Sequence, residues 1–241
     1  YLKNYDTHNA TTLSHAFANT AAANNAVVFD LSSCTSASSM FSGSGITSAS
    51  LSNTGGVTSF DYAFGNCDDL VSVNLFDTSA ATTAQGMFSG CASLTTVPQF
   101  DLSHSADVQN MFRNCTQLTS VPLLDTSSAT RFDYMFYNCS ALTAIPLIDT
   151  SNAVNMKYMC SYCTSITEVP LLDTSSVNNV AGMFENCVNV ETGALDLYNQ
   201  LSSQSVPPQY HSNCFKDCGS NTTSGAAELS QIPSSWGGTG V

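Results

Sequence analysis

The ten cysteines are the residues of this sequence with the widest chemistry, because thiolates bind metals, form disulfides and act as nucleophiles. Most of them close a repeated pentapeptide of the form Met-Phe-x-Asn-Cys, of which Met135-Phe136-Tyr137-Asn138-Cys139 is a full copy. A cysteine in every copy raises the question of a repeated metal or redox site. Six of the ten recur at intervals of 24 residues: Cys67, Cys91, Cys115, Cys139, Cys163 and Cys187.

The regular spacing argues against both disulfides and zinc. Stacked repeats place equivalent cysteines in a column with parallel Cα–Cβ bonds, whereas a disulfide needs bonds that converge. The two close pairs, Cys160/Cys163 and Cys214/Cys218, have no pair of histidines to complete a four-ligand zinc set. We therefore expect small buried thiols that fill a core position. Reducing agent is expected to change thermal stability little.

A second series places one aspartate in each repeat. Carboxylates one repeat apart could bind Ca²⁺, which takes about six to eight oxygen ligands. Calcium sites in stacked repeats usually need several carboxylates per turn, so the stronger interpretation is that each aspartate accepts backbone N–H bonds in its own turn. The series is Asp77, Asp101, Asp125, Asp149, Asp173 and Asp196, and the weak calcium candidates are Asp101, Asp125, Asp149 and Asp173.

Tyrosines and cations on two adjacent repeats form the best candidate for a ligand site. Tyr134 and Tyr158 precede the methionine of their repeats, where other repeats have Gly or Asn, so the scaffold does not require an aromatic residue there. Such a face could bind a sugar or a protein, and the alternative is ordinary packing between neighbouring repeats. The candidate ligand-binding residues are Tyr134, Tyr137, Tyr158, Tyr162, Arg131 and Lys157.

Nothing in the sequence points to catalysis or to a cofactor. The four histidines, His8, His15, His104 and His211, share no repeat position. There is no Gly-x-Ser-x-Gly nucleophile elbow and no glycine-rich phosphate loop after a strand. A net charge of −13 disfavours nucleic-acid binding. The sequence also lacks a run of about 18 apolar residues, so membrane insertion is not expected.

The elements that must position these residues follow from the 24-residue period, which is typical of a solenoid of stacked coils. Leu118, Val121 and Leu124 predict a short strand with one apolar edge, and Pro122 marks a strand end or bend, because proline cannot donate to a ladder. The Asp-Thr-Ser that follows predicts a turn. Apolar residues then recur at intervals of about three, which predicts a one-turn helical or irregular leg. Strands of successive coils are expected to pair in parallel.

The regularity of the repeats suggests three segments. Residues 1–15 are interpreted as an N-terminal cap or incoming segment, and residues 16–218 as a solenoid of about nine coils with an inserted loop at 197–213. Residues 219–241 are expected to form a C-terminal cap or linker, in which Trp236 covers the open end. The solenoid ends are candidate surfaces for self-association.

The pattern Leu124-Asp125-Thr126-Ser127, followed by Tyr134-Met135-Phe136-Tyr137-Asn138-Cys139, resembles bacterial leucine-rich-repeat surface proteins of the BspA-like kind. It is most similar to the DUF285 repeat of mycoplasma surface lipoproteins. The resemblance implies a right-handed β-solenoid of leucine-rich-repeat type on a bacterial cell surface, often in adhesion or host contact. Similar repeats occur in bacteriophage tail and fibre proteins. The family brings no catalytic residues.

These observations lead to a functional hypothesis and one alternative. Charged residues are only 10% of the chain, against about 25% in typical soluble domains, which favours an extracellular or virion setting. The hypothesis is a non-enzymatic recognition or adhesion module on a bacterial cell surface, with a rigid repeated face for a host or neighbouring-cell protein or glycan. The alternative is a bacteriophage virion protein, such as a tail fibre, receptor-binding or decoration protein.

Overall fold

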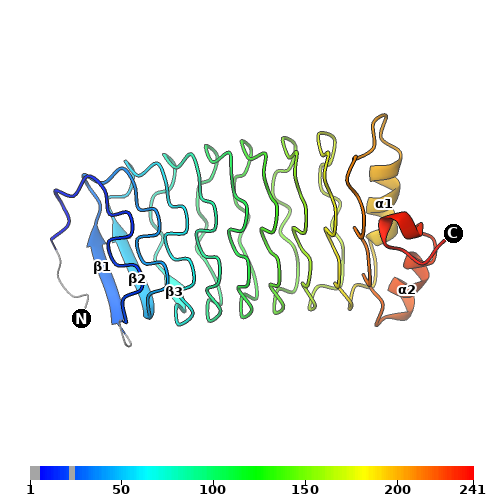
Figure 1. Cartoon of the computed structure of the whole chain (residues 1–241), viewed down its shortest axis with the longest axis horizontal. Coiled ribbons are helices and arrows are strands. Elements are labelled where there is room, and N and C mark those ends of the chain that lie inside the picture. Colours follow the sequence, from blue (N-terminus) through cyan, green and yellow to red (C-terminus); the bar gives the residue numbers. More distant parts are fainter. Residues whose placement is uncertain (1–5, 22–24) are drawn as a thin grey trace.

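Parallel backbone bridges run along the molecule and define its axis. Within the coils, each joins residues 23 or 24 positions apart, except the bridge between Asn179 and Tyr210, which spans an insertion. The computed structural model describes residues 6–21 and 25–241, and this part of the chain forms one elongated stack of coils, with strands at one end and helices at the other (Figure 1). The bridged residues are Thr12, Ser36, Ser59, Thr83, Asp107, Arg131, Asn155, Asn179 and Tyr210.

A turn contact of the regular coils also occurs near the N-terminus. The Thr7 hydroxyl donates to the carbonyl oxygen of Asp30 at 2.6 Å. The Thr78 hydroxyl makes the equivalent bond to the Asp101 carbonyl at 2.7 Å, so the two threonines occupy the same position in their coils. Residues 6–15 therefore share a turn contact with the later coils, although they lack the Met-Phe-x-Asn-Cys motif. The assignment of residues 1–15 as an N-terminal cap or incoming segment stays a prediction. Residues 1–5 lie outside the described part of the chain.

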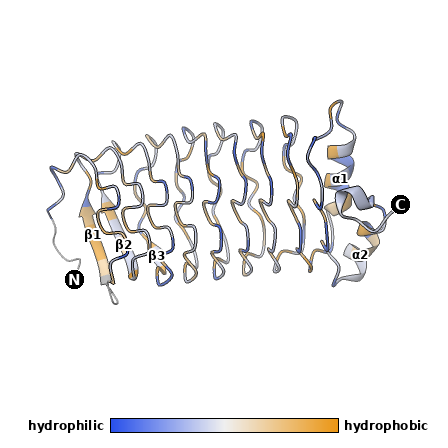
Figure 2. Ribbon diagram, in the orientation of Figure 1, coloured by the Kyte–Doolittle hydropathy of each residue, from blue (hydrophilic) through white to orange (hydrophobic). Residues whose placement is uncertain are grey.

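Regular strands are confined to the N-terminal coils. Strands β1 (Asn25–Asp30), β2 (Ile46–Ser52) and β3 (Ser72–Val73) form one parallel sheet in the order β1-β2-β3. Figure 2 shows β1 as mainly hydrophobic. The expectation of a strand in every coil is wrong, since the described coils after β3 contain only isolated bridges on this side.

Proline explains where the strands stop. The backbone N–H of Asn74, directly after β3, donates to the carbonyl oxygen of Ala49 at 3.1 Å. The equivalent position of each of the next four coils is a proline, which has no N–H to give. The backbone there stays extended without a continuous ladder. These residues are Pro98, Pro122, Pro146 and Pro170.

The return leg of each coil is a series of turns and not a helical turn. Met135 N–H donates within its coil to the Phe132 carbonyl at 3.1 Å, whereas Tyr134 N–H donates to Lys157 of the next coil at 2.9 Å. Successive N–H groups alternate in this way because two residues per coil, four positions apart, have left-handed backbone conformations. In this coil they are Tyr134 and Asn138, with φ of 58° and 57°. A 3₁₀ helix would send every N–H along its own chain.

The Met-Phe-x-Asn-Cys motif supplies the core, as its periodicity predicts. Met135, Phe136 and Cys139 are all 0% exposed. The phenylalanine rings stack from coil to coil, and Phe112 lies 5.7 Å from Phe136 with an interplanar angle of 5°. The thiols form a second column along the axis, in which Cys139 Sγ donates to the carbonyl oxygen of Phe112 in the preceding coil at 3.0 Å. Each of the six cysteines spaced 24 residues apart thus links two coils without a covalent bond.

All ten cysteines are buried and free. Burial raises the pKa of Cys115 and of Cys163 to about 12, so these thiols are protonated and unreactive at neutral pH. We predict that millimolar reducing agent leaves the melting temperature unchanged. Ellman's reagent should modify almost no thiol in the native protein and all ten after denaturation. A melting temperature that falls by several degrees in reductant would contradict the free-thiol arrangement.

The C-terminal end is closed by helices. The predicted inserted loop at 197–213 is wrong in its first part, because helix α1 covers Ala194–Ser202. Leu197 and Leu201, one helical turn apart, are fully buried and hold α1 against the last coils. The side-chain amides of Gln200 and Gln204 donate to the Thr174 hydroxyl at 2.9 and 2.8 Å. The two glutamine side chains thus occupy the edge of the coil at Thr174, where a further regular coil would form its hydrogen bonds.

The insertion also removes Asp196 from the aspartate series, since this residue lies in the first turn of α1. Beyond the last coil, helix α2 (Thr223–Leu229) and the 3₁₀ helix η1 (Ser234–Trp236) complete the chain. Trp236 is 7% exposed and stacks on the His211 ring at 4.1 Å. Its carbonyl oxygen accepts a hydrogen bond from the Phe215 N–H of the last coil at 2.9 Å.

Candidate functional site

Three of the four tyrosines singled out in the sequence occupy left-handed backbone positions. Tyr134 and Tyr158 take the first such position of their coils, with φ of 58° and 52°. Tyr162 takes the second, with φ of 62°, where Asn138 and Asn186 stand in other coils. Asn and Gly adopt this conformation readily, whereas other residues do so at a cost of about 1–2 kcal/mol each. The chain therefore holds large aromatic side chains at positions that favour small or amide residues.

The four rings gather into one cluster that spans two coils. Tyr134 and Tyr158 stack with their centroids 5.3 Å apart and their planes at 27°. Tyr137 meets Tyr134 and Tyr162 edge to face, at 5.6 Å in both cases. Glycine ends the stack at the next coil, because a Cβ on Gly182 would collide with the Tyr158 ring.

Two cations lie over these rings. The Arg113 guanidinium carbon is 5.4 Å from the Tyr134 centroid and 5.5 Å from the Tyr137 centroid. Lys157 Nζ is 5.3 Å from the Tyr158 centroid. Both distances are within the range of about 6 Å for cation–π attraction. Such contacts hold the cations beside the rings and leave the N–H groups of Arg113 and Lys157 able to donate hydrogen bonds to other groups.

A shallow cavity of about 360 Å³ opens between these side chains. We call it the tyrosine pocket, and its lining comprises Arg113, Tyr134, Tyr137, Tyr158, Tyr162 and Glu185. Its volume lies near the lower limit of ligand sites, which is about 300 Å³. Burial raises the pKa of the Tyr137 phenol, so this hydroxyl remains a donor throughout the physiological range. Glu185 pairs with Lys216 at 3.5 Å beside the pocket.

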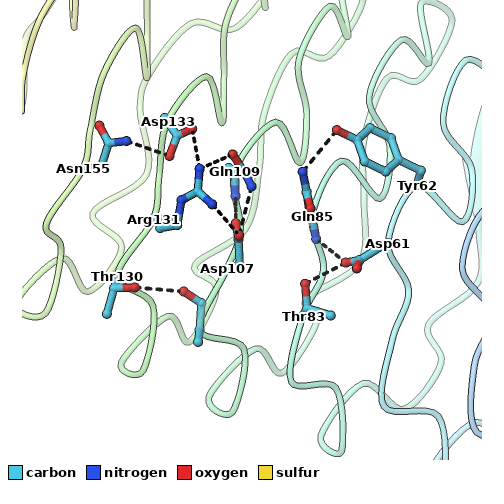
Figure 3. Close-up of polar contacts among 11 residues, drawn as sticks. Asp61, Tyr62, Thr83, Gln85, Asp107, Gln109, Thr130, Arg131, Asp133 and Asn155 are labelled. Atoms are coloured by element: carbon cyan, nitrogen blue, oxygen red, sulfur yellow. Dashed lines mark hydrogen bonds and ion pairs between the residues drawn. The ribbon is translucent and has the colours of Figure 1, made fainter.

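The structure brings together five of the six predicted site residues and separates Arg131 from them. Figure 3 shows Arg131 between two carboxylates of its own face. Its guanidinium donates to Asp107 and Asp133 at 3.3 Å each and to the Gln109 side chain at 2.7 Å. Because Asp133 is only 6% exposed, its charge needs a partner, and Arg131 supplies one. Arg131 therefore has a structural role in linking coils.

Sequence reasoning missed Arg113 and Glu185. Both occupy the variable position of the Met-Phe-x-Asn-Cys motif, which is also the position of Tyr137. Arg113 is one coil before Tyr137 and Glu185 is two coils after it. The variable position of neighbouring coils is therefore the signal that could have found them, because residues in one column lie side by side along the axis.

The aspartate series serves its own turns, as the stronger of the two interpretations proposed. Asp101 Oδ1 accepts the Ser103 N–H at 2.9 Å, and Asp125 Oδ1 accepts the Ser127 N–H at 3.1 Å. Asp149 and Asp173 make the same bond, each at 2.9 Å. The hydrogen bonds from Ser103 lower the pKa of Asp101. Within residues 6–21 and 25–241, no three His, Cys, Asp or Glu side chains are grouped so that they could hold a metal ion.

A second exposed feature lies on the proline side of the coils. Leu123, Leu147 and Leu171 occupy one column and are 58–68% exposed. Leu123 and Leu147 line a hollow of about 350 Å³ together with Asp125 and Asp149. This surface lacks the aromatic rings and the cations of the tyrosine pocket, and the sequence pattern of buried leucines did not predict it.

Comparison with known proteins places these features in a family context. The model of DUF285, described as "Mycoplasma protein of unknown function", matches residues 1–97, 44–146 and 106–215. No curated protein matches the sequence. Among the described residues, no helix has the length and apolar character needed to cross a membrane.

Two solved structures match parts of this chain. A leucine-rich repeat protein from Eubacterium ventriosum is 14% identical, with a TM-score of 0.41, over 87% of this chain and 68% of that one. A leucine-rich repeat protein from Bacteroides ovatus is 15% identical, with a TM-score of 0.31, over 80% of this chain and 62% of that one.

Proposed function

The chain belongs to the DUF285 family, and from that premise we propose that it is a non-enzymatic recognition module whose binding site is the tyrosine pocket. The carrying observation is that tyrosines occupy left-handed positions in two successive coils and stack there, whereas the coils on either side have Asn110 and Gly182. The fold does not require this strain of about 1–2 kcal/mol per residue, since glycine or asparagine fills the position in those coils. Tyr62 takes the same position between Ser39 and Gly86, so the support comes from the gathering of tyrosines in neighbouring coils. A repeat family conserves a scaffold and varies its surface, so the specificity belongs to these variable positions.

The setting that we propose is the outer surface of a bacterial cell, where the module contacts a protein or glycan of a host or neighbouring cell. The low charge content and the abundance of Ser, Thr and Asn support this setting. A right-handed winding of the coils is part of the proposal, because parallel crossover connections are right-handed in about 98% of cases. The same composition also fits a bacteriophage virion protein, and no observation favours that alternative over the cell surface.

A binding role is also better supported than catalysis. Burial raises the pKa of nearly every cysteine, so the thiols do not supply a nucleophile at neutral pH. His211 stacks on Trp236 in the C-terminal cap, while His8 pairs with Asp6 at the other end. These two imidazoles therefore lie at opposite ends of the described stack, and each already has a partner of its own.

The test replaces both stacked tyrosines by the residue that another coil has at their position. We expect the Tyr134→Asn, Tyr158→Asn double variant to keep the fold, because Asn110 takes the same left-handed conformation with φ of 59°. Binding to cells or to immobilised glycans should fall by more than about tenfold, since each buried aromatic contact contributes about 1 kcal/mol or more. Flow cytometry with the labelled protein and a glycan array provide the measurement.

Tyr62 is the matched control. It occupies the same left-handed position, with φ of 50°, but lies outside the pocket. Tyr62→Asn should leave binding unchanged, while circular dichroism shows that all variants are folded. Equal binding by the wild type and the double variant would mean that the tyrosines are only packing between coils.

A further inference from the structure

The few cations of this chain are not spread evenly. The sequence has five Lys and Arg residues against 18 Asp and Glu. Four of the five cations lie in the described part of the chain: Arg113, Arg131, Lys157 and Lys216. Arg131 neutralises the carboxylates of Asp107 and Asp133. The other three border the tyrosine pocket, so a strongly acidic protein has gathered its positive charge at one place.

Two of these cations have no carboxylate partner. Lys216 pairs with Glu185, but neither Arg113 nor Lys157 forms an ion pair with any residue in the ranges 6–21 and 25–241. Both instead lie over tyrosine rings. Because the chain has 18 acidic residues and few cations, two cations without a carboxylate partner are a feature of this site and not of the whole surface. Their charge is available to a ligand.

The position of Arg113 suits an anion. Its side chain is exposed, and its guanidinium carbon is held over Tyr134 and Tyr137. A guanidinium over an aromatic face keeps its N–H groups at the edge, where they can form two parallel hydrogen bonds to a carboxylate. The tyrosines restrict the side chain before the ligand arrives, which lowers the entropic cost of binding.

The rest of the lining indicates what carries the anion. The pocket is surrounded by phenol groups, and it has no aliphatic side chain that would receive an apolar residue of a peptide. Aromatic rings offer flat apolar faces together with hydroxyl groups that donate and accept hydrogen bonds. Pyranose rings have the complementary character, with C–H faces and many hydroxyls.

We propose that the tyrosine pocket binds a saccharide that bears a carboxylate, with the carboxylate on Arg113 and the sugar ring against the tyrosines. This inference rests on the proposed function and adds the charge and chemical class of the ligand. Glu185 opposes such a ligand and limits its affinity, and Lys216 offsets that carboxylate at 3.5 Å.

The experiment compares acidic saccharides with matched neutral ones. Isothermal titration would compare oligogalacturonate and sialyllactose each with its own methyl ester, because the two members of each pair differ mainly in the charge of the carboxyl group. At least one acidic probe should bind about tenfold or more tightly than its neutral partner. Salt dependence alone is a weaker test, since salt also screens the repulsion between an anion and a protein with a net charge of −13.

Three variants sharpen the result. Arg113→Gln should remove the difference between acidic and neutral probes, and Arg113→Lys should restore part of it, because lysine keeps the charge but not the paired donors. Glu185→Gln should increase affinity for the acidic probe several-fold, because it removes the opposing charge. An effect in opposite directions at two exposed or half-buried positions cannot arise from unfolding.

The outcomes separate this inference from the proposed function. Equal binding of acidic and neutral saccharides would overturn the inference and leave the recognition role intact. Tighter binding of a glutamate-rich hexapeptide than of every saccharide would overturn the saccharide class. If no saccharide binds, the inference is wrong, and the cell-binding comparison of Tyr134 and Tyr158 with Tyr62 still decides the proposed function.

Discussion

Raising the pH from 7 to 10 is expected to unfold this protein. Desolvation by burial raises the pKa of nine thiols, and for Cys115 and Cys163 the value reaches about 12. In the unfolded chain the same groups titrate near the ordinary pKa of a thiol, about 9. The folded state thus keeps protons that the unfolded state releases, so stability is fully present below pH 9 and is lost as the pH rises toward the folded values. The nine are Cys67, Cys91, Cys115, Cys139, Cys160, Cys163, Cys187, Cys214 and Cys218.

The size of the effect follows from the number of thiols. Each contributes about 1.4 kcal/mol per pH unit once the unfolded form is ionised. The eight thiols with the largest rises in pKa together remove on the order of 3 kcal/mol at pH 9 and about 10 kcal/mol at pH 10, which is comparable to the entire stability of a typical domain. Because the repeat places a buried cysteine in each regular coil, the losses of unfolding free energy at high pH add along the solenoid.

Urea unfolding between pH 7 and 9.5, in the presence of a phosphine reductant, measures this loss. A variant with Cys91→Ser, Cys139→Ser and Cys187→Ser is the control, because serine can still donate to the carbonyl of the preceding coil but does not titrate in this range. The dependence of unfolding free energy on pH should be about one third smaller in this variant, whatever its starting stability. A free energy that is constant up to pH 9.5 would show that water reaches the thiols in the folded state.

The sequence predicted the buried column of the motif well and the backbone between motifs less well. The period of 24 residues and the apolar types of Met135, Phe136 and Cys139 were sufficient to predict the core, because a buried column needs only a matching side chain in each coil. The prediction of a strand in every coil is wrong at Pro122 and its equivalents, because proline has no backbone N–H to donate to a ladder. The sequence does not indicate α1, because Leu197 and Leu201 lie where the 24-residue period is interrupted, and one pair of leucines four positions apart is a weak helix signal.

The candidate site shows a similar division. The tyrosine column could be predicted because Gly86, Asn110 and Gly182 stand at the position of Tyr134 in other coils. The same substitution pattern also carries the signal for a left-handed backbone, since Gly and Asn favour it. Distance along the sequence favours Arg131, which is three residues before Tyr134, over Arg113, which is one coil before Tyr137. Only the arrangement of the coils shows that Arg131 pairs with Asp107, whereas Arg113 lies over the tyrosine rings.

Replacing Phe112 by alanine should lower the free energy of unfolding by about 3–5 kcal/mol. Phe112 is 0% exposed and stacks between Phe88 at 5.9 Å and Phe136 at 5.7 Å. The substitution removes contacts on two sides and leaves a cavity in the middle of the stack. Phe112→Leu, which keeps most of the volume, should cost about 1.5 kcal/mol or less. Cys160 stands at the equivalent position two coils later. Because its side chain is much smaller than that of phenylalanine, Cys160→Ala should also lower the free energy of unfolding only slightly.

Phe112→Ala should also change how the protein unfolds, because each coil contacts only its neighbours and cooperativity passes through the stack. Trp236, the single tryptophan, lies in the C-terminal cap and reports on that end, while far-ultraviolet circular dichroism reports on all coils. The two signals should coincide during urea unfolding of the wild type and separate in the alanine variant, with the fluorescence change at higher urea, because α1 and α2 hold the C-terminal end. A loss below about 1 kcal/mol with coincident signals would instead mean that the coils close over the cavity, in which case the column of phenylalanines fills space but does not couple one half of the solenoid to the other.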